Sequence, residues 1–301
     1  MQLTILGTGA GGPFQGRNYT AQVLQVENHY YLIDCGEGAQ HQLYRFRAPC
    51  DRFQQMFISH LHGDHVFGLI GLLTSYCLKQ RTKKLEIFSP PGLRELIEHT
   101  ARICGIVFPY PIAYTEVDTS ISQIVFENKH VEVYTIPLNH RTACSGWLFR
   151  EKSRPRNIRK EKIVEFDIPV QLIPGIKAGA DLNLSDGRLI PNETLTLPPR
   201  PPRSFAFCSD TAPSEIVREV VAGVDLLYHE ATFTEEHRAE AGLSFHSTAV
   251  QAAEIARAAG VKRLLIGHFS GRYTSADQHL AEARGVFAES YTAEEGQTYA
   301  I

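Results

Sequence analysis

Short apolar segments alternate with longer amphipathic ones along most of the chain, a pattern typical of an α/β fold. Strands are predicted where four to seven apolar or alternating positions are bounded by turn residues, at 3–6, 21–26, 30–33, 54–58, 85–88, 131–137, 204–208, 224–228 and 261–266. Helices are predicted at 66–73, 92–104 and 214–221, and at a segment that Ser247 caps and Gly260 closes.

One stretch, from Ser59 to His65, holds three imidazoles and a carboxylate within six residues. Residues two apart on an extended backbone point to the same side, so His60 and His62 can bind one ion. Gly63 permits a tight turn that brings the next two ligands to a second position. The alternative is a run of surface histidines with an aspartate capping the following helix. The candidate metal ligands of this stretch are His60, His62, Asp64 and His65.

Polar residues of the ligand type also follow later strands, at the strand ends where open α/β sheets place their sites. Taken alone, His140 is more typical of a core or loop histidine. If the strand ends converge, one metal is bound by His60, His62 and His140, a second by Asp64, His65 and His268, and Asp210 bridges the two. Imidazole and carboxylate donors suit zinc, and manganese or cobalt also fit.

Such a site would attract a phosphodiester, because two divalent ions bring more positive charge than two carboxylates cancel. A water between ions roughly 3.5–4 Å apart loses its proton near neutral pH and becomes a nucleophile. Asp64 is placed to accept a proton, and His246, held by Glu230, is the candidate acid for the leaving oxygen. The alternative for the last two residues is a structural His–Glu pair.

Residues 150–203 differ from the rest of the chain. A run rich in Lys and Arg is followed by a segment rich in Gly, Pro and Asp, and the stretch ends in Pro198-Pro199-Arg200-Pro201-Pro202-Arg203, which must be stiff and extended. A solvated surface or a ligand for a proline-binding domain are alternatives. We expect an arm inserted into one domain, 1–301, with phosphate contacts as its function.

Other features narrow the class of protein. The loop Gly7-Thr8-Gly9-Ala10-Gly11-Gly12 matches a dinucleotide-binding pattern, but a second strand follows it where that site needs a helix. No apolar segment is long enough for a membrane span, and no export signal is evident. The six cysteines are scattered singly, which favours a reducing cytoplasm. With a net charge of −3, nucleic-acid binding would need a local basic surface.

Taken together, these motifs resemble the metallo-β-lactamase superfamily and, within it, the short form of ribonuclease Z, the tRNA 3′-processing endonuclease. The stretches that carry the resemblance are Ser59–His65, Asn139-His140, Ser209-Asp210-Thr211, His229-Glu230-Ala231-Thr232, His246-Ser247-Thr248 and Gly267-His268, with Leu6-Gly7-Thr8-Gly9 and Arg17-Asn18 near the start.

The resemblance implies an αββα sandwich, two Zn²⁺ ions per subunit, a homodimer, and hydrolysis of precursor tRNA after the discriminator base that leaves a 3′-hydroxyl. It assigns metal binding to the seven ligands above and catalysis to Asp64, His246 and Glu230. The segment Ile173–Gly179 is only a loose version of the family's arm tip. A small-molecule phosphodiesterase and a non-catalytic tRNA-binding protein are the alternative functions.

Overall fold

The computed structural model describes residues 1–12 and 14–301, so Pro13, in the glycine-rich loop, lies outside the described residues. The chain divides into two compact units. Unit 1 comprises Met1–Arg150 and Arg203–Ile301, and unit 2 comprises Glu151–Pro202.

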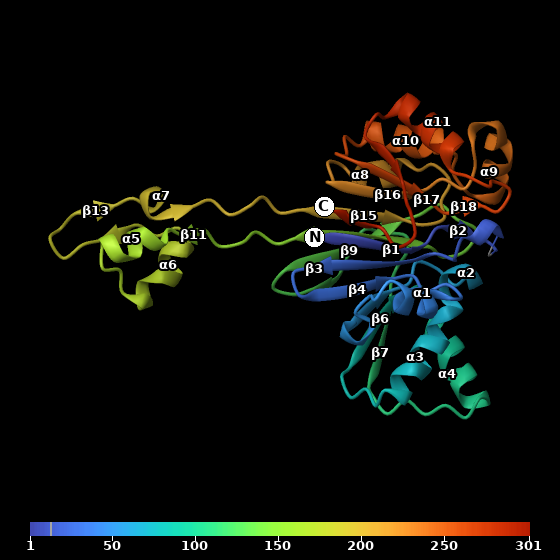
Figure 1. The fold of residues 1–301 in the computed structure, drawn as a ribbon, viewed down its shortest axis with the longest axis horizontal. Coiled ribbons are helices and arrows are strands. Elements are labelled where there is room, and N and C mark those ends of the chain that lie inside the picture. The colour runs from blue at the N-terminus through green and yellow to red at the C-terminus, as the bar shows by residue number, and fades with distance from the viewer. Residues whose placement is uncertain (13) are drawn as a thin grey trace. The chain divides into compact units, whose positions relative to one another are not determined.

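Two large mixed sheets form the centre of the described part of unit 1 (Figure 1). The first has the order β20-β1-β3-β4-β5-β6-β7, with bounds Thr298–Ala300, Gln2–Gly7, Ala21–Val26, His29–Ile33, Gln55–Phe57, Leu85–Ser89 and Ile112–Glu116. The second has the order β19-β17-β16-β15-β10-β9-β8, with bounds Ser290–Thr292, Leu264–Gly267, Leu226–Glu230, Ser204–Cys208, Ser145–Glu151, Val131–Pro137 and Ile124–Glu127. A short parallel pair joins β2 (Gly9–Ala10) to β18 (Phe269–Ser270).

Helices cover the outer faces of the two sheets (Figure 1). Those packed on the first sheet are α1 (Ala39–Arg45), α3 (Gly68–Leu78) and α4 (Leu93–Ile103). Those packed on the second are α8 (Glu215–Val220), α10 (Ala249–Ala258) and α11 (Asp277–Val286). Between the sheets lies an aromatic core that includes Tyr31, Phe57, Trp147, Phe149 and Phe207. The architecture is the predicted αββα sandwich.

The topology gathers several strand ends at one rim. In the first sheet β4, β5 and β6 run parallel, and in the second β15, β16 and β17 run parallel. The carboxyl ends of neighbouring parallel strands lie at the same edge of a sheet. Loops far apart in the sequence therefore meet there, including those that begin at Asp34, Ser59, Ser209 and His268.

Unit 2 has a small core of its own, which the Gly- and Pro-rich sequence of this segment did not predict. Its elements are β11 (Asn157–Ile158) paired with β14 (Thr196–Leu197), β12 (Leu182–Asn183) paired with β13 (Leu189–Ile190), and the helices α5 (Lys160–Glu165), α6 (Ile173–Lys177) and α7 (Asn192–Leu195). The buried apolar side chains of this core are Ile168, Ile176, Leu182 and Leu195.

Two local predictions need correction. The helix after the histidine stretch was expected from Val66, whereas α2 already spans Gly63–Val66 and α3 follows from Gly68. Ser247 was expected to cap α10, but the cap is Thr248, whose hydroxyl accepts from the Gln251 amide in a capping box. Among the described residues, no helix combines the length and the apolar character that a membrane crossing requires.

Candidate metal centre

The loop that follows β5 carries the first ligands. Phe57 ends this short buried strand, and His62 has extended backbone before α2 begins at Gly63. Extended backbone places His60 and His62 on one side, as their spacing predicted. The helical turn then places Asp64 and His65 next to each other, with His65 fully buried.

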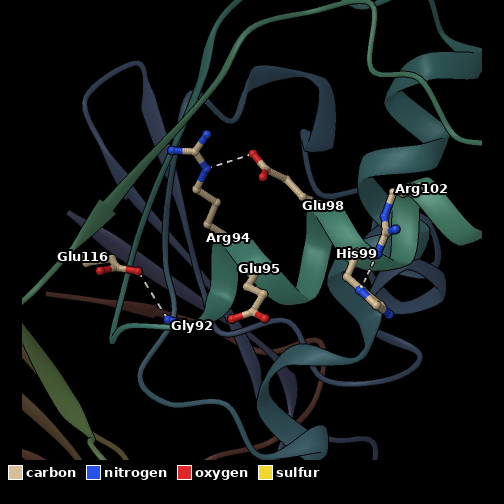
Figure 2. Close-up of a pocket in the computed structure, with 7 residues that line it drawn as sticks. All are labelled: Gly92, Arg94, Glu95, Glu98, His99, Arg102 and Glu116. Atoms are coloured by element: carbon tan, nitrogen blue, oxygen red, sulfur yellow. Dashed lines mark hydrogen bonds and ion pairs between the residues drawn. The ribbon is translucent and has the colours of Figure 1, made fainter.

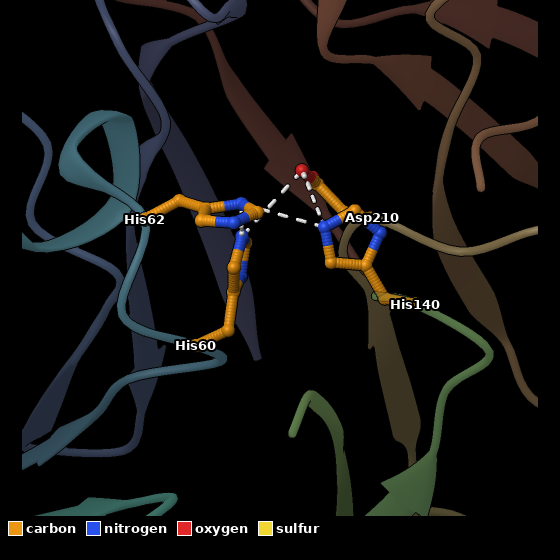
Figure 3. A group of neighbouring side chains, drawn as sticks. All are labelled: His60, His62, His140 and Asp210. Carbon is orange, nitrogen blue, oxygen red and sulfur yellow. Dashed lines mark hydrogen bonds and ion pairs between the residues drawn. The ribbon is translucent and has the colours of Figure 1, made fainter. Parts of the chain in front are cut away.

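Four side chains form the first group: His60, His62, His140 and Asp210 (Figure 3). The Nδ1 atom of His62 lies 3.0 Å from His60 Nε2 and 3.4 Å from His140 Nε2. The Oδ2 atom of Asp210 lies 3.5 Å from His60 Nε2 and 3.9 Å from His140 Nε2. Figure 3 shows His62 and His140 facing each other from different parts of the chain.

Asp64, His65 and His268 form the second group. The Nε2 atoms of His65 and His268 lie 3.2 Å apart, and each is 3.6 Å from Asp64 Oδ2. The Oδ1 atom of Asp210 lies 3.3 Å from His65 Nε2 and 3.2 Å from His268 Nε2. Asp210 therefore presents one oxygen to each group, as expected of a bridging carboxylate.

Hydrogen bonds hold the outer nitrogens of four of these histidines. The Nδ1 of His65 contacts Asp34 Oδ2 at 2.8 Å, and that of His140 donates to the Phe245 carbonyl at 3.2 Å. The hydroxyls of Ser59 and Thr232 donate to carboxylates, so their oxygens are free to accept a second hydrogen bond. Ser59 Oγ accepts from His60 Nδ1 at 3.0 Å, and Thr232 Oγ1 accepts from His268 Nδ1 at 3.0 Å. The inner nitrogens are left as lone-pair donors, the tautomer that metal binding requires.

The donor set fits a divalent metal ion. Unprotonated imidazole nitrogens repel each other at 3.0–3.4 Å, so either a shared proton or a shared cation must lie among them. Burial lowers the pKa of His60, and His65 lowers it further, whereas for His65 itself Asp210 and Asp34 outweigh burial and raise the pKa. For Asp210, burial raises the pKa, but the charges of His268, His65 and His60 outweigh this and hold it well below its usual range. A buried carboxylate whose pKa is held low, set among imidazole nitrogens, is an arrangement suited to binding a cation.

Hydrogen bonds hold the carboxylates of Asp34 and Asp64 in place. Asp34 is fully buried at a left-handed φ of 54°, and it accepts from the Ser59 amide and hydroxyl as well as facing His65. Its carboxylate therefore orients the ring of His65. Asp64 Oδ2 accepts from the Gly11 amide at 2.8 Å. Burial raises the pKa of Asp64, but its hydrogen bond with His268 and the charges of His65 and His268 lower it overall.

His246 and Glu230 lie beside the cluster in direct contact. Glu230 Oε1 accepts from His246 Nδ1 at 2.9 Å, and the Nε2 of that ring is 4.0 Å from Asp210 Oδ2. The fully buried Glu230 also accepts from the amides of Thr211, Thr232 and Ser247. Burial lowers the pKa of His246, but Glu230 outweighs it and raises the pKa to about 9.

The structure thus brings together all seven predicted metal ligands and both members of the His246–Glu230 pair. His229 does not join them, because its Nδ1 contacts the Glu230 carbonyl and its Nε2 is buried without a partner. Arg17 and Asn18, from the motif near the start of the chain, bond to the Tyr273 carbonyl and to Glu295.

The roles of Ser59, Thr232 and Phe245 as partners of the ligands were not predicted from the sequence. For Ser59 and Thr232 the available signal was their place next to, or within, motifs already singled out. For Phe245 the partner is a main-chain carbonyl, which no side-chain pattern reveals.

A separate hollow lies at the start of α4 (Figure 2). Its polar groups are largely engaged with one another: Arg94 bonds to Glu98, Arg102 to His99, and Glu116 accepts from the Gly92 amide. These pairings are typical of a solvated helix surface, and they leave the cluster at the strand ends as the candidate site.

Comparison with known proteins agrees with this geometry. The chain is 44% identical over 294 residues to ribonuclease Z of Bacteroides fragilis strain YCH46, covering 98% of this chain and 97% of that protein. It is 44% identical to ribonuclease Z of Porphyromonas gingivalis strain W83, covering 97% and 96%. Residues 1–103 also match the sequence family described as anti-Pycsar protein Apyc1.

Solved structures show the same fold. The short form of human tRNase Z aligns with a TM-score of 0.71 and 26% identity, covering 100% of this chain and 99% of that one. The metallo-β-lactamase fold protein YhfI of Bacillus subtilis aligns with a TM-score of 0.69 and 16% identity, covering 99% and 98%. The fold is that of the metallo-β-lactamases. Because the chain is 44% identical to these two ribonucleases Z over nearly its whole length, it belongs to the ribonuclease Z family.

Proposed function

We infer that this chain is a hydrolase that cleaves precursor tRNA after the discriminator base, releasing the 3′ trailer and leaving a 3′-hydroxyl on the tRNA. The observation that carries this inference is the convergence of seven imidazole and carboxylate donors at one rim of a ribonuclease Z family chain. A protein that only binds tRNA has no need of such a cluster.

We propose that the cluster holds two Zn²⁺ ions, one on His60, His62 and His140 and one on Asp64, His65 and His268, with Asp210 between them. When bound, the ions supply Lewis-acid activation of water and positive charge for the phosphoryl oxygens. The oxygen and nitrogen donors also suit Mn²⁺ or Co²⁺.

The remaining steps belong to side chains. Asp64, fixed by the Gly11 amide, accepts the proton of the attacking water. The Nε2 of His246 lies 4.0 Å from Asp210 Oδ2, and Glu230 accepts from its Nδ1. His246 therefore donates the proton that the leaving 3′ oxygen needs, and Glu230 keeps the ring in orientation and stabilises its charged form.

Unit 2 is the proposed contact for the tRNA away from the cleavage site. It carries nine Lys and Arg residues against seven Asp and Glu residues, so it is net positive in a chain whose overall charge is −3. Several of these cations face carboxylates, as Lys162 does with Glu165 and Arg188 with Asp186. Arg154, Arg156 and Lys177 line a hollow of this unit and are the favoured phosphate contacts.

We further propose that the chain works in the cytoplasm as a homodimer. The cysteines among the described residues are free thiols, which suits a reducing compartment. Light scattering coupled to size exclusion would give a mass of about 67 kDa for the dimer, twice the 33.7 kDa of one chain.

The central experiment compares two substrates with matched variants. Purified protein is incubated with a trailer-bearing precursor tRNA and with bis(p-nitrophenyl) phosphate, alongside Asp64→Ala and the control Asp51→Ala. We expect wild type to process both, with a 3′-hydroxyl on the tRNA product. Asp64→Ala loses both activities, and the control, which removes only an exposed ion pair with Lys79, keeps both.

Each alternative function has its own outcome. Hydrolysis of the small diester without cleavage of precursor tRNA would identify a small-molecule phosphodiesterase. Binding of precursor tRNA by folded, metal-loaded protein with no turnover of either substrate would identify a non-catalytic tRNA-binding protein.

A further inference from the structure

Two large aromatic side chains are exposed right beside the buried metal ligands. Phe67 is 60% exposed, and Phe245 is 38% exposed. They come from different elements, one from the junction of α2 and α3 and one from the end of α9 (Arg238–Ser244). Each is held in place by a local feature of the backbone.

Phe67 lies against the loop that carries the first ligands. A Cβ placed on Gly63 would lie 2.5 Å from Cε2 of this ring, so the ring packs directly on the backbone of Gly63. Gly63 stands between the ligands His62 and Asp64 in the chain. Any residue larger than glycine at this position would push the ring away from the loop.

Phe245 occupies a position where glycine is normally favoured. It ends α9 with a φ of 61°, in the left-handed region that a bulky side chain rarely adopts. Its carbonyl accepts from His140 Nδ1, and the next residue is His246. The carbonyl contact requires only the backbone, which glycine would provide without strain. The large ring is therefore kept for something other than that contact.

We infer that these two rings stack on the unpaired bases on either side of the scissile phosphate, an inference that rests on the proposed function. A phosphodiester at the cluster has one nucleoside on each side. His62 and His140 face each other across the first group (Figure 3), with Phe67 next to the loop of His62 and Phe245 next to His140. Aromatic rings bind unpaired bases through their faces, largely independently of sequence.

The position of His246 indicates which base stacks on which ring. His246 is the proposed donor to the leaving 3′ oxygen, and it is adjacent to Phe245 in the chain. The nucleotide that carries this oxygen, the discriminator, therefore places its base on Phe245. The first trailer nucleotide, on the other side of the phosphate, places its base on Phe67.

The test pairs each ring with a missing base. Precursor tRNAs with the normal bases, with an abasic discriminator, or with an abasic first trailer nucleotide are cleaved by wild type, Phe245→Gly and Phe67→Ala under single-turnover conditions. On the normal substrate we expect kcat/KM to fall by about tenfold or more in each variant. On the substrate with an abasic discriminator, Phe245→Gly should cleave as fast as wild type, while Phe67→Ala should still be slower. On the substrate with an abasic first trailer nucleotide, Phe67→Ala should cleave as fast as wild type, while Phe245→Gly should still be slower.

Controls separate stacking from a structural effect. Phe245→Gly keeps the left-handed backbone available, and metal content and thermal unfolding report whether the site and fold remain intact. Phe245→Trp and Phe67→Trp should restore cleavage of the normal substrate. Leu243→Ala, which removes an exposed apolar side chain of the same helix α9, should leave cleavage unchanged.

Equal losses on normal and abasic substrates would overturn the inference, because they would show that the rings act through the protein structure. Unchanged cleavage in both variants, or the same loss in Leu243→Ala, would also overturn it. Failure of wild type to cleave the normal precursor would instead refute the proposed function itself.

Discussion

At the scale of single residues, the geometry of the site depends on groups that do not bind metal. Asp34 accepts from Ser59 and faces His65 Nδ1 at 2.8 Å, so it fixes the ring that serves the second group. Its backbone is left-handed, a conformation that asparagine tolerates as well as aspartate. Asp34→Asn therefore removes the charge with little cost to the backbone.

We expect Asp34→Asn to weaken metal binding by about 10- to 100-fold, the usual effect of losing a carboxylate behind a ligand histidine. The amide can no longer stabilise the orientation of His65 as a negative charge does. Chelator competition, followed by metal analysis of the protein, measures the change. Asp51→Asn, an exposed carboxylate paired with Lys79, is the control. Equal metal affinity in Asp34→Asn and wild type would contradict this role.

His279 makes stability depend on pH. Its ring is fully buried in α11, with ring centroids 5.0 Å from Phe269 and 4.5 Å from Tyr273. Burial lowers its pKa from 6.5 to about 4. The unfolded chain therefore takes up a proton that the folded chain excludes as the pH falls below 6.5, so this contribution to stability is present above pH 6.5 and is lost toward pH 4.

We expect the free energy of unfolding of wild type to fall by up to about 3 kcal/mol more than that of His279→Gln between pH 7 and pH 4. Urea titrations at several pH values give the two profiles. The variant starts from a different stability at pH 7, so the slopes are compared rather than the absolute values. Parallel profiles would show that His279 does not titrate in this way.

Individual ligands were predictable because imidazole and carboxylate side chains bind metals and because these residues directly follow predicted strands. The cluster at His60–His65 needs only the period of an extended backbone and one glycine turn. A hydrogen bond to a main-chain carbonyl cannot be predicted from the type of residue that provides it. The Phe245 carbonyl meets His140 only because a helix ends in a left-handed residue, and nothing in the identity of Phe245 indicates that conformation.

At the scale of elements, close backbone contacts set the position of the ligand loop. Gly68, the first residue of α3, touches the loop after β4, and a Cβ there would lie 2.1 Å from the Gly36 carbonyl oxygen. Main chain cannot give way as a flexible side chain can. The amide of Gly68 also donates to the Cys35 carbonyl at 2.9 Å, which ties the helix to the loop that carries Asp34.

Gly68→Ala should therefore lower the free energy of unfolding by roughly 2–3 kcal/mol. The matched control is Gly242→Ala in α9, where a Cβ would meet nothing within 4 Å. That variant should gain roughly 0.5–1 kcal/mol, since alanine loses less chain entropy than glycine in a helix. Denaturant unfolding measures both. A Gly68→Ala protein as stable as wild type would mean that the loop moves freely away from α3.

Elements with a clear period were predicted well and their ends less so. The segment 92–104 corresponds to α4, because it has one sustained apolar face, and 21–26 corresponds to β3, whose apolar side chains are buried on both faces of the sheet. Ser247 and Thr248 are both hydroxyl residues at the start of α10, and only the geometry of the chain decides that Thr248 caps it. The short pairs of unit 2 have two residues per strand, too few for any period to appear.

At the scale of the whole molecule, the site is a product of topology. Each sheet contributes strand ends to the rim, the first sheet through the loop of His60 and the second through Asp210 and His268. Sequence analysis could propose this convergence from the alternation of strands and helices. The order of strands within each sheet depends on long-range pairing, which local patterns do not encode.

We propose that unit 2 binds the body of the tRNA while unit 1 carries the chemistry, and a deletion tests this. Arg150 pairs with Ser204 on neighbouring strands β10 and β15, so Glu151–Pro202 can be replaced by Asn-Gly, leaving a short hairpin connection. Unit 1 retains both sheets, so we expect the shortened protein to fold, as circular dichroism would show, and to hydrolyse bis(p-nitrophenyl) phosphate. Its kcat/KM for precursor tRNA should fall on the order of 100-fold, because distant phosphate contacts are lost, and the remaining activity should depend less on salt. Unchanged cleavage of precursor tRNA would contradict a binding role for unit 2, and loss of both activities by a folded protein would show that unit 2 is needed for the chemistry as well.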